Sequence, residues 1–223
     1  MFVRDCMTPD PRTIEPDATL DEALSLMGAL KIRHLPVVDG SQLVGIVTWT
    51  DLMGVVPMPG RRRRTANGTG LLANAQVKDV MTKDPLTVSP DAPVEIAARM
   101  LRERKIGSLP VIERHMLVGI VTESDLFDAL VYLLGGDIRG VRMSLELPNG
   151  LADVTRFTAA LADLTVEKNA VVVTIRVDEV SHRGYVRVAT PSPLALTEHL
   201  ATAGFEISNL RFDGVPKNAR RTS

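Results

Sequence analysis

The chain is poor in the residues that carry most redox and metal chemistry. It has one cysteine, Cys6, and four histidines among 223 residues. A single cysteine cannot form an intrachain disulfide, and we interpret Cys6 as a small buried apolar residue. The histidines lack metal-ligand spacing, and no P-loop, GxGxxG or nucleophile motif occurs. We therefore expect a protein that is not an enzyme and that requires no cofactor or metal.

Charge of one sign and long hydrophobic runs are also missing. The 26 basic and 27 acidic residues leave a net charge of −1, so no overall field would recruit nucleic acid or a membrane surface. No apolar run approaches the roughly 18 residues of a spanning helix, and the start, MFVRDCMTPDP, lacks the apolar core of a signal peptide. We expect a cytoplasmic protein with neither a membrane nor nucleic acid as a partner.

What the chain does contain is an internal repeat. Shifting the sequence by 74 residues aligns Val3–Leu52 with Val77–Leu126 without a gap, and 24 of the 50 pairs are identical. The stretch LVGIVTWTDL at Leu43–Leu52 returns as LVGIVTESDL at Leu117–Leu126. Its run of β-branched residues indicates a buried strand, which leads directly into Thr-x-x-Asp. Nothing local explains such similarity, so the chain carries the same structural unit twice.

The repeated Thr-x-x-Asp, at Thr48–Asp51 and Thr122–Asp125, has two interpretations. As a capping box it only starts a helix, because the threonine accepts from the amide three residues on and the aspartate reaches back. As a binding motif it would place a phosphate at the helix N-terminus and the two hydroxyls of a ribose at the carboxylate. The same residues can do both.

Other local signals predict where the elements of each repeat begin. Met7–Pro9 and Met81-Thr82 are expected to be turns that open the two copies. Thr19–Glu22 is a second capping-box candidate, and the matching helix of the other copy is expected to have Pro93 in its first turn.

Each copy reads V-x-D-x-M-T-x-D-P-x-T-x-x-P-D-A, or close to it, followed by a helix, K-I-x-x-L-P-V and the repeated strand. This order resembles a CBS domain, and two in tandem resemble a Bateman module. The resemblance implies an α/β (α+β) CBS pair with pseudo-two-fold symmetry, with repeat 1 at residues 1–56 and repeat 2 at residues 77–134. It also implies an adenosine ligand such as AMP, ADP, ATP or S-adenosylmethionine, bound in the cleft of the pair.

The same resemblance implies the residues of the site. In related pairs the position just before the L-P-V strand, predicted here at Leu35–Asp39, faces the ligand, which makes Arg33 and His34 phosphate ligands of the first half-site. Gly107 and Ser108 would leave room for a base or a smaller group. Exposure of Arg33 and His34 to solvent alone is the alternative. The full set of nucleotide-binding residues implied is Thr13, Ile14, Arg33, His34, Thr48, Asp51, Thr87, Val88, Gly107, Ser108, Thr122 and Asp125.

Residues 57–76 form an Arg/Gly/Pro linker between the repeats. The run Arg61–Arg64 could bind nucleic acid or reach a nucleotide phosphate. With no aromatic neighbour it is more typical of a solvated loop. After the second repeat the equivalent segment, Phe127–Leu134, continues as an apolar helix that stops at Gly135-Gly136.

The pattern changes at residue 139. Alternating apolar residues predict strands at Val141–Leu147, Val171–Val177, Tyr185–Ala189 and Phe205–Phe212, with helices after Gly150 and over Pro191–Ala203. The order βαββαβ predicts a ferredoxin-like domain over residues 139–213. Residues 214–223 are predicted to be a disordered tail.

The strand, Pro148-Asn149-Gly150 turn and helix resemble an ACT domain, a family that senses amino acids and other small effectors. Its effector site would include Asn149, Gly150 and Leu151, although Gly150 could be a plain turn glycine. Two CBS copies followed by such a domain resemble the acetoin-utilisation AcuB-type proteins. We therefore expect a homodimeric regulatory sensor of an adenine nucleotide and a second effector, which acts on an unknown target protein. A structural dimerisation module with no ligand is the alternative.

Overall fold

The computed structural model describes residues 1–55, 75–136, 140–168, 171–178, 182–190 and 192–213, and it divides the chain into two compact units, Met1–Phe127 and Asp128–Ser223. Among the side chains, those of residues 163–168 and most of 171–178 are not described. The predicted arginine loop at Arg61–Arg64 and the predicted tail at 214–223 lie outside the described residues. No helix in the described part of the chain is long and apolar enough to span a membrane.

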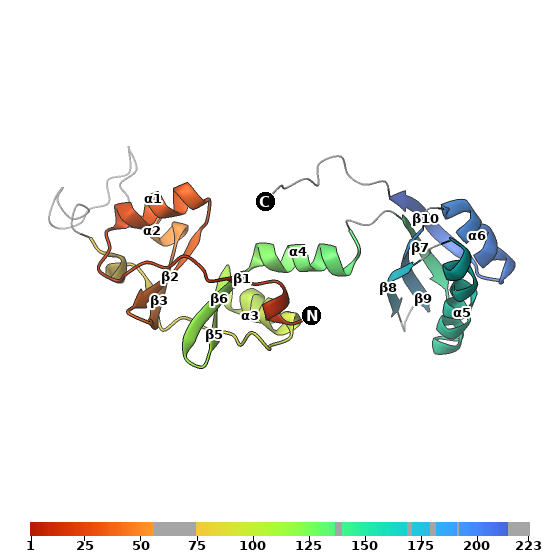
Figure 1. The fold of residues 1–223 in the computed structure, drawn as a ribbon, viewed down its shortest axis with the longest axis horizontal. Helices are drawn as coiled ribbons and strands as arrows, with labels where there is room; N and C mark the ends of the chain where they lie inside the picture. Colours follow the sequence, from red (N-terminus) through yellow and green to blue (C-terminus); the bar gives the residue numbers. More distant parts are fainter. Residues whose placement is uncertain (56–74, 137–139, 169–170, 179–181, 191, 214–223) are drawn as a thin grey trace. The chain divides into compact units, whose positions relative to one another are not determined.

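The two repeats fold into the same series of elements (Figure 1). The first runs η1 (Val3–Asp5), β1 (Thr8–Pro9), α1 (Leu20–Leu30), β2 (His34–Asp39), β3 (Gln42–Thr48) and α2 (Trp49–Val55). The second runs η2 (Val77–Asp79), β4 (Thr82–Lys83), α3 (Val94–Arg104), β5 (Ser108–Glu113), β6 (Met116–Thr122) and α4 (Glu123–Leu133). Every predicted helix and strand in the repeats is present, and the bounds differ by a few residues.

The helices of the two repeats begin in different ways. At α1 the Thr19 side chain accepts from the Glu22 amide, and the Glu22 carboxylate accepts from the Thr19 amide at 2.8 Å. This is the predicted capping box. At α3 the equivalent residue is Pro93, which we expected inside the first turn. It stands at the N-cap instead, where it contributes no side-chain hydrogen bond.

The start of each repeat belongs to the sheet of the other repeat. We predicted only turns at Met7–Pro9 and at Met81-Thr82. The structure corrects this, because Thr8–Pro9 pairs antiparallel with β6 and Thr82–Lys83 pairs with β3. The resulting three-stranded sheets have the orders β1-β6-β5 and β2-β3-β4. Consequently neither repeat has a complete sheet without the other.

The exchange extends into the cores. Val3, from the first repeat, is fully buried in the core formed by α3, β5 and β6, and Val77 is fully buried in the core of the first repeat. The backbone follows the same symmetry, because the Val3 amide donates to the Ala92 carbonyl and the Val77 amide to the Ala18 carbonyl, both at 2.9 Å. The two hydrophobic cores are therefore built jointly.

The glycine of each GIVT strand is required by this exchange. A side chain at Gly45 would meet the sulfur of Met81 at 2.4 Å, and one at Gly119 would meet the sulfur of Met7 at 2.6 Å. Since Met7 and Met81 come from the opposite repeat, the two glycines leave the room that the incoming segments occupy. The methionine at the start of one repeat and the glycine at the end of the other thus form a packed pair.

The C-terminal unit follows the predicted βαββαβ order (Figure 1). Its elements are β7 (Gly140–Glu146), α5 (Leu151–Lys168), β8 (Val171–Asp178), β9 (Arg183–Ala189), α6 (Pro193–Thr202) and β10 (Ile207–Asp213). The sheet is antiparallel throughout with strand order β10-β7-β9-β8, which is the ferredoxin-like arrangement. Both helices pack on one face, where Phe157, Leu196 and Leu200 meet the buried side of β7 and β9.

Candidate functional site

The two Thr-x-x-Asp motifs adopt the same capped geometry. The Asp51 carboxylate accepts from the Thr48 amide at 2.8 Å and from the Thr48 hydroxyl at 2.7 Å, and the Asp51 amide donates to the Thr48 hydroxyl oxygen at 3.2 Å. The bonds between Thr122 and Asp125 have lengths of 2.7, 2.8 and 3.3 Å. The capping-box interpretation is therefore correct for both copies.

The cap leaves part of each aspartate for other contacts. All of these bonds to the carboxylates use Oδ2, so the bonds of the cap do not involve Oδ1 of Asp51 or Asp125. Both aspartates are half-buried, and they stand in the first turns of α2 and α4. A carboxylate held in this way has one fixed oxygen and one available acceptor, as the binding interpretation requires.

His34 lies where the two repeats meet. It pairs in register with Thr48 across β2 and β3, so it stands beside the first capped motif. Its imidazole occupies the space in front of Gly107, where an added Cβ would lie 2.8 Å from Nε2. Burial lowers the pKa of His34, and the nearby Arg33 lowers it further, against smaller opposite effects of Glu123 and Asp51. The neutral imidazole is therefore favoured, because burial and the Arg33 guanidinium outweigh the effect of the two carboxylates on its pKa.

The other residues at this position are placed differently. Arg33 is exposed, and its carbonyl accepts from the Trp49 amide at 2.9 Å. Ser108 is buried and pairs in register with Thr122. The room that we predicted next to Gly107 is taken by the His34 ring. The His34 side chain of the first repeat therefore packs against Gly107 of the second repeat at this point.

The short segments predicted to line the cleft sit beside the sheets. Ile14 bridges to Val37 in parallel, with its amide donating to the Pro36 carbonyl at 3.0 Å, and Val88 bridges in the same way to Val111. Ile14 and Val88 are buried, whereas Thr13 is half-buried and Thr87 is exposed. The predicted set thus divides into strand ends that carry the capped motifs and outer segments on the far side of β2 and β5.

Two residues near the site were not selected from the sequence. Glu123, inside the second motif, is close enough to His34 to act on its charge. Cys6 lies near Asp125, and burial first and this carboxylate second raise the pKa of its thiol. The sequence contained a signal for Glu123, which stands where the first copy has Trp49. The position of Cys6 depends on the exchange of segments between repeats, which the repeat alignment does not reveal.

The effector site predicted in the C-terminal unit is a tightly bonded turn. Gly150 has φ +58°, which explains the glycine. The Asn149 amide donates to Asp153 at 2.8 Å, and Asp153 also accepts from Arg156 at 2.9 Å. The hydrogen bond from the Asn149 amide is the main cause that lowers the pKa of Asp153. Leu151 is exposed. Asn149 therefore stabilises the start of α5, because it binds Asp153 in the first turn of that helix.

Among the residues that the structure describes, no three histidine, cysteine, aspartate or glutamate side chains gather closely enough to hold a metal ion. The candidate site consists of the two capped aspartates, Asp51 and Asp125, together with His34, which lies where the repeats meet.

Comparison with known families gives a match to the CBS domain at residues 3–57 and again at residues 77–132. A CBS domain-containing protein of Dictyostelium discoideum is 35% identical over 136 residues, which cover 60% of this chain and 94% of that protein. Several other curated relatives are much longer, and the chain spans only 22–23% of their length.

The solved structures that are similar to the chain include two that it covers almost completely. A Vibrio cholerae protein assigned to acetoin utilization (AcuB) is 35% identical, with a TM-score of 0.51, covering 60% of this chain and 93% of that one. The CBS domain pair of protein MJ0100, in complex with 5′-methylthioadenosine and S-adenosyl-L-methionine, is 26% identical, with a TM-score of 0.50, covering 61% of this chain and 97% of that one. These matches leave about 40% of the chain uncovered, so the ACT resemblance of the C-terminal unit stays a prediction.

Proposed function

The chain belongs to the CBS-domain family, and from this we propose that it is a non-enzymatic regulatory sensor of an adenosine ligand. The observation that carries the proposal is the pair of capped aspartates, Asp51 and Asp125, each of which has Oδ1 outside its cap. A carboxylate oxygen of this kind can accept the vicinal hydroxyls of a ribose. The ligand would be AMP, ADP, ATP or S-adenosylmethionine.

Each repeat contributes an equivalent set of roles in this proposal. Asp51 and Asp125 bind ribose hydroxyls, and Thr48 and Thr122 lie at the phosphate end of α2 and α4. Thr13-Ile14 and Thr87-Val88 line the cleft from the outer side of each sheet. The complex of protein MJ0100 supports the choice of ligand, because both of its ligands contain adenosine.

The experiment is isothermal calorimetry of the full chain with AMP, ATP and S-adenosylmethionine. We expect the Asp51→Ala, Asp125→Ala double variant to lose at least tenfold in affinity for the ligand that wild-type binds, since a hydrogen bond to a charged group contributes about 1.5–3 kcal/mol. The matched control is Glu22→Ala, which removes the same kind of cap at Thr19 away from the site. Undiminished affinity of the double variant would reject the roles of both aspartates.

We further propose that the two half-sites are not equivalent. Arg33 and His34 of the first have Gly107 and Ser108 as their counterparts in the second. The exposed guanidinium of Arg33 can reach a phosphate chain, whereas a glycine offers no charge. We expect Arg33→Ala to weaken ATP binding about tenfold and adenosine binding less than twofold. An equal loss for both ligands would contradict the assignment.

We propose that the protein is a homodimer and that nucleotide binding is coupled to the C-terminal unit. Support comes from α4 and the residue after it, which leave Phe127, Leu130, Val131 and Leu134 exposed at the spacing of one helix face. Phe127 is 66% exposed, and an apolar stripe of this kind is typical of an interface. A two-fold assembly is the commonest closed form of a homo-oligomer. Nucleotide would act by favouring one arrangement of the dimer.

Sedimentation velocity at micromolar concentration, with and without ATP, tests this assembly. We expect a dimer that dissociates when Phe127 and Leu130 are both replaced by serine. Replacement of Leu194, an exposed leucine at the start of α6, is the control. A monomer under all conditions would end the proposal. A dimer whose sedimentation coefficient does not change with ATP would support the assembly and contradict the coupling.

The same apolar face supports the second candidate, a structural dimerisation module that binds no ligand. A thermal-shift screen distinguishes the sensor from the module, because a ligand at 100 times its Kd adds about 2.7 kcal/mol to the free energy of unfolding. No shift with any adenosine compound, together with a stable dimer, would favour the module. The amino acid or other small effector proposed for Asn149, Gly150 and Leu151 is screened in the same way.

A further inference from the structure

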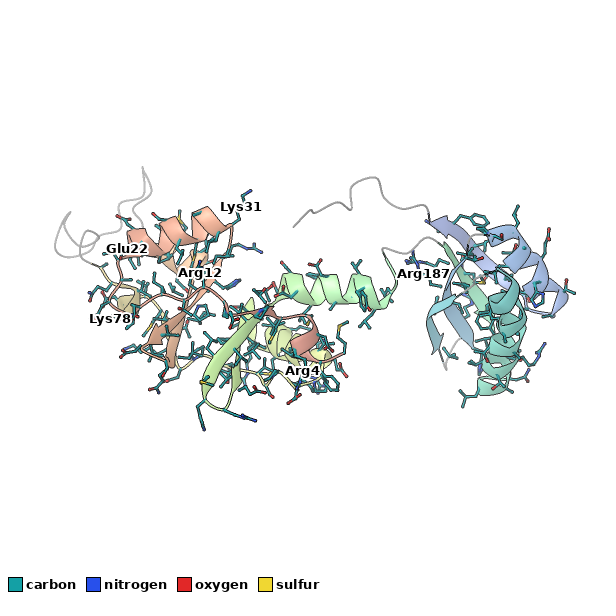
Figure 2. The ribbon with its side chains drawn as sticks, in the orientation of Figure 1. Arg4, Arg12, Glu22, Lys31, Lys78 and Arg187 are labelled. Atoms are coloured by element: carbon teal, nitrogen blue, oxygen red, sulfur yellow. The ribbon has the colours of Figure 1, made fainter. Side chains whose placement is uncertain are left out.

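The face of the C-terminal sheet that α5 and α6 do not cover carries three arginines in register. Arg211 of β10 is paired with Arg142 of β7, and Arg142 is paired in turn with Arg187 of β9. Figure 2 shows Arg187 on the side of the sheet away from the two helices. Their apolar neighbours along the strands, such as Met143 and Val186, are buried in the core on the other side. The alternation of the strands therefore puts three guanidinium groups in one row across this face.

The row borders a cavity of about 270 Å³. Arg142, Arg187 and Arg211 all line it, together with Ser144, Tyr185 and Asn209. Arg187 is only 3% exposed and Ser144 only 5%. An arginine is seldom buried to this degree unless it is paired, and Arg187 does make an interaction within the chain. Arg187 is therefore held in place at the wall of the cavity.

Like charges directly opposite one another destabilise a sheet. The three guanidinium groups stand opposite one another on neighbouring strands, so an anion that lies between them would reduce their mutual repulsion. Arg142 and Arg187 each already make an interaction within the chain. Since a guanidinium has five N–H donors in a planar fork, each still has the capacity to bind a ligand. The fork matches the two oxygens of a carboxylate or phosphate, which a lysine could not do.

We infer that this cavity binds a small organic oxyanion, a carboxylate or phosphate monoester with a short apolar part. The anionic group would lie against Arg142, Arg187 and Arg211, and the apolar part against the Tyr185 ring and the Leu134 side chain. The size of the cavity suits a molecule of a few carbon atoms. Single-stranded nucleic acid fits less well, because it needs several exposed aromatic rings. Among the described residues that line the cavity, Tyr185 is the only aromatic one.

This site differs from the turn at Asn149–Leu151 and does not rest on nucleotide binding by the repeats. Its test uses the full chain and two arms of probes. The carboxylate arm is isovalerate, with isovaleramide as its uncharged match, and the phosphate arm is inorganic phosphate and propyl phosphate. Amide and arginine side-chain chemical shifts report the binding, because they identify the strands that respond. We expect one arm to shift resonances of β7, β9 and β10 and the uncharged amide to shift none.

The variants are Arg142→Gln and Arg211→Gln, both of which change exposed side chains and so preserve the buried Arg187. We expect each to weaken binding of the preferred probe about tenfold or more. The matched control is Arg183→Gln on the same strand as Arg187, whose guanidinium pairs with Glu146 at 2.9 Å and does not line the cavity. It should change affinity less than twofold.

Three results would overturn the inference. The first is no response of wild-type to either arm at millimolar concentration, and the second is an equal loss in the Arg183 control. The third is tighter binding of a ten-nucleotide oligothymidylate than of any small anion, abolished by the Arg142 and Arg211 variants, which would make the face a nucleic-acid surface. Calorimetry with the adenosine ligand on the same variants should match wild-type, so a failure here is distinct from a failure of the nucleotide site.

Discussion

At the scale of single residues, the capped aspartates combine a structural and a binding role in one carboxylate. The threonine fixes Oδ2 through its amide and hydroxyl, at distances between 2.7 and 2.8 Å in both copies. These two bonds are part of the cap that starts the helix, and they also set the direction of Oδ1. The stability of the helix and the geometry of the proposed ribose contact therefore depend on the same pair.

Replacement of the threonine should separate these effects. We expect Thr48→Ala to lower the free energy of unfolding by about 1 kcal/mol through loss of the N-cap. It should also weaken adenosine binding, because Asp51 loses the hydroxyl that holds it. Thr19→Ala removes an equivalent cap at α1 and should lower stability with no effect on binding. Chemical denaturation and calorimetry measure the two quantities, and unchanged binding by Thr48→Ala would show that the hydroxyl does not orient the carboxylate.

His34 should make stability depend on pH. Burial and then Arg33 lower its pKa in the folded protein, so below the unfolded value of about 6.5 the unfolded chain binds more protons. The free energy of unfolding should therefore fall as pH drops below about 6.5 toward the lower pKa of the folded state. In His34→Gln this part of the pH dependence should disappear, as urea titrations between pH 5 and 8 can measure. His115→Gln, at an exposed turn, is the control, and an unaltered slope in His34→Gln would contradict the prediction.

At the scale of elements, the important feature is the exchange of the starting segments. Each sheet of the pair takes its third strand from the other repeat, and each core takes a valine from it. Ion pairs at the surface follow the same symmetry, since Arg4 pairs with Asp91 and Lys78 pairs with Asp17. An element at the start of one repeat is therefore a structural part of the other.

A substitution at Val3 should consequently lower the stability of the second repeat. We expect Val3→Ala to cost about 2 kcal/mol, since it removes two buried methyl groups and leaves a cavity. Hydrogen exchange should show the loss of protection in α3 and β5, which belong to the second repeat. Leu194→Ala, at a position of α6 that is 71% exposed, also removes apolar atoms and has little expected cost. Loss of protection confined to the first repeat would disprove joint cores.

At the scale of the whole molecule, the chain consists of two compact units with separate cores. The repeats share strands and core residues with each other, so they should unfold together. The C-terminal unit has its own four-stranded sheet and helices and should unfold as a second cooperative unit.

Scanning calorimetry should therefore give two transitions. An adenosine ligand should raise the Tm of the transition of the repeats more than the Tm of the other transition, since it binds directly to the repeats. The Gly119→Ala variant, which forces a side chain against Met7, should lower the same transition. Gly150→Ala, at a left-handed position, should lower only the transition of the C-terminal unit. A shift of both transitions by one variant would show that the units unfold together.

The sequence by itself determined the repeat, the helices and longer strands within it, the capping boxes and the βαββαβ order of the C-terminal unit. These follow from identity at a fixed spacing and from local periodicity, which depend on residues close together in the chain. The sequence also singled out Asp51 and Asp125, because a local motif holds each one. The nucleotide roles of these residues stay predictions.

Only the tertiary structure decided which segments meet. The pairing of Thr8–Pro9 with β6, the burial of Val3 beside residues of the second repeat and the packing of His34 against Gly107 join positions far apart in the chain. Their cause is the burial of apolar surface and the completion of sheet edges, which local patterns do not encode. The arginine row depends in the same way on strand register, since Arg142, Arg187 and Arg211 become neighbours only when β7, β9 and β10 align.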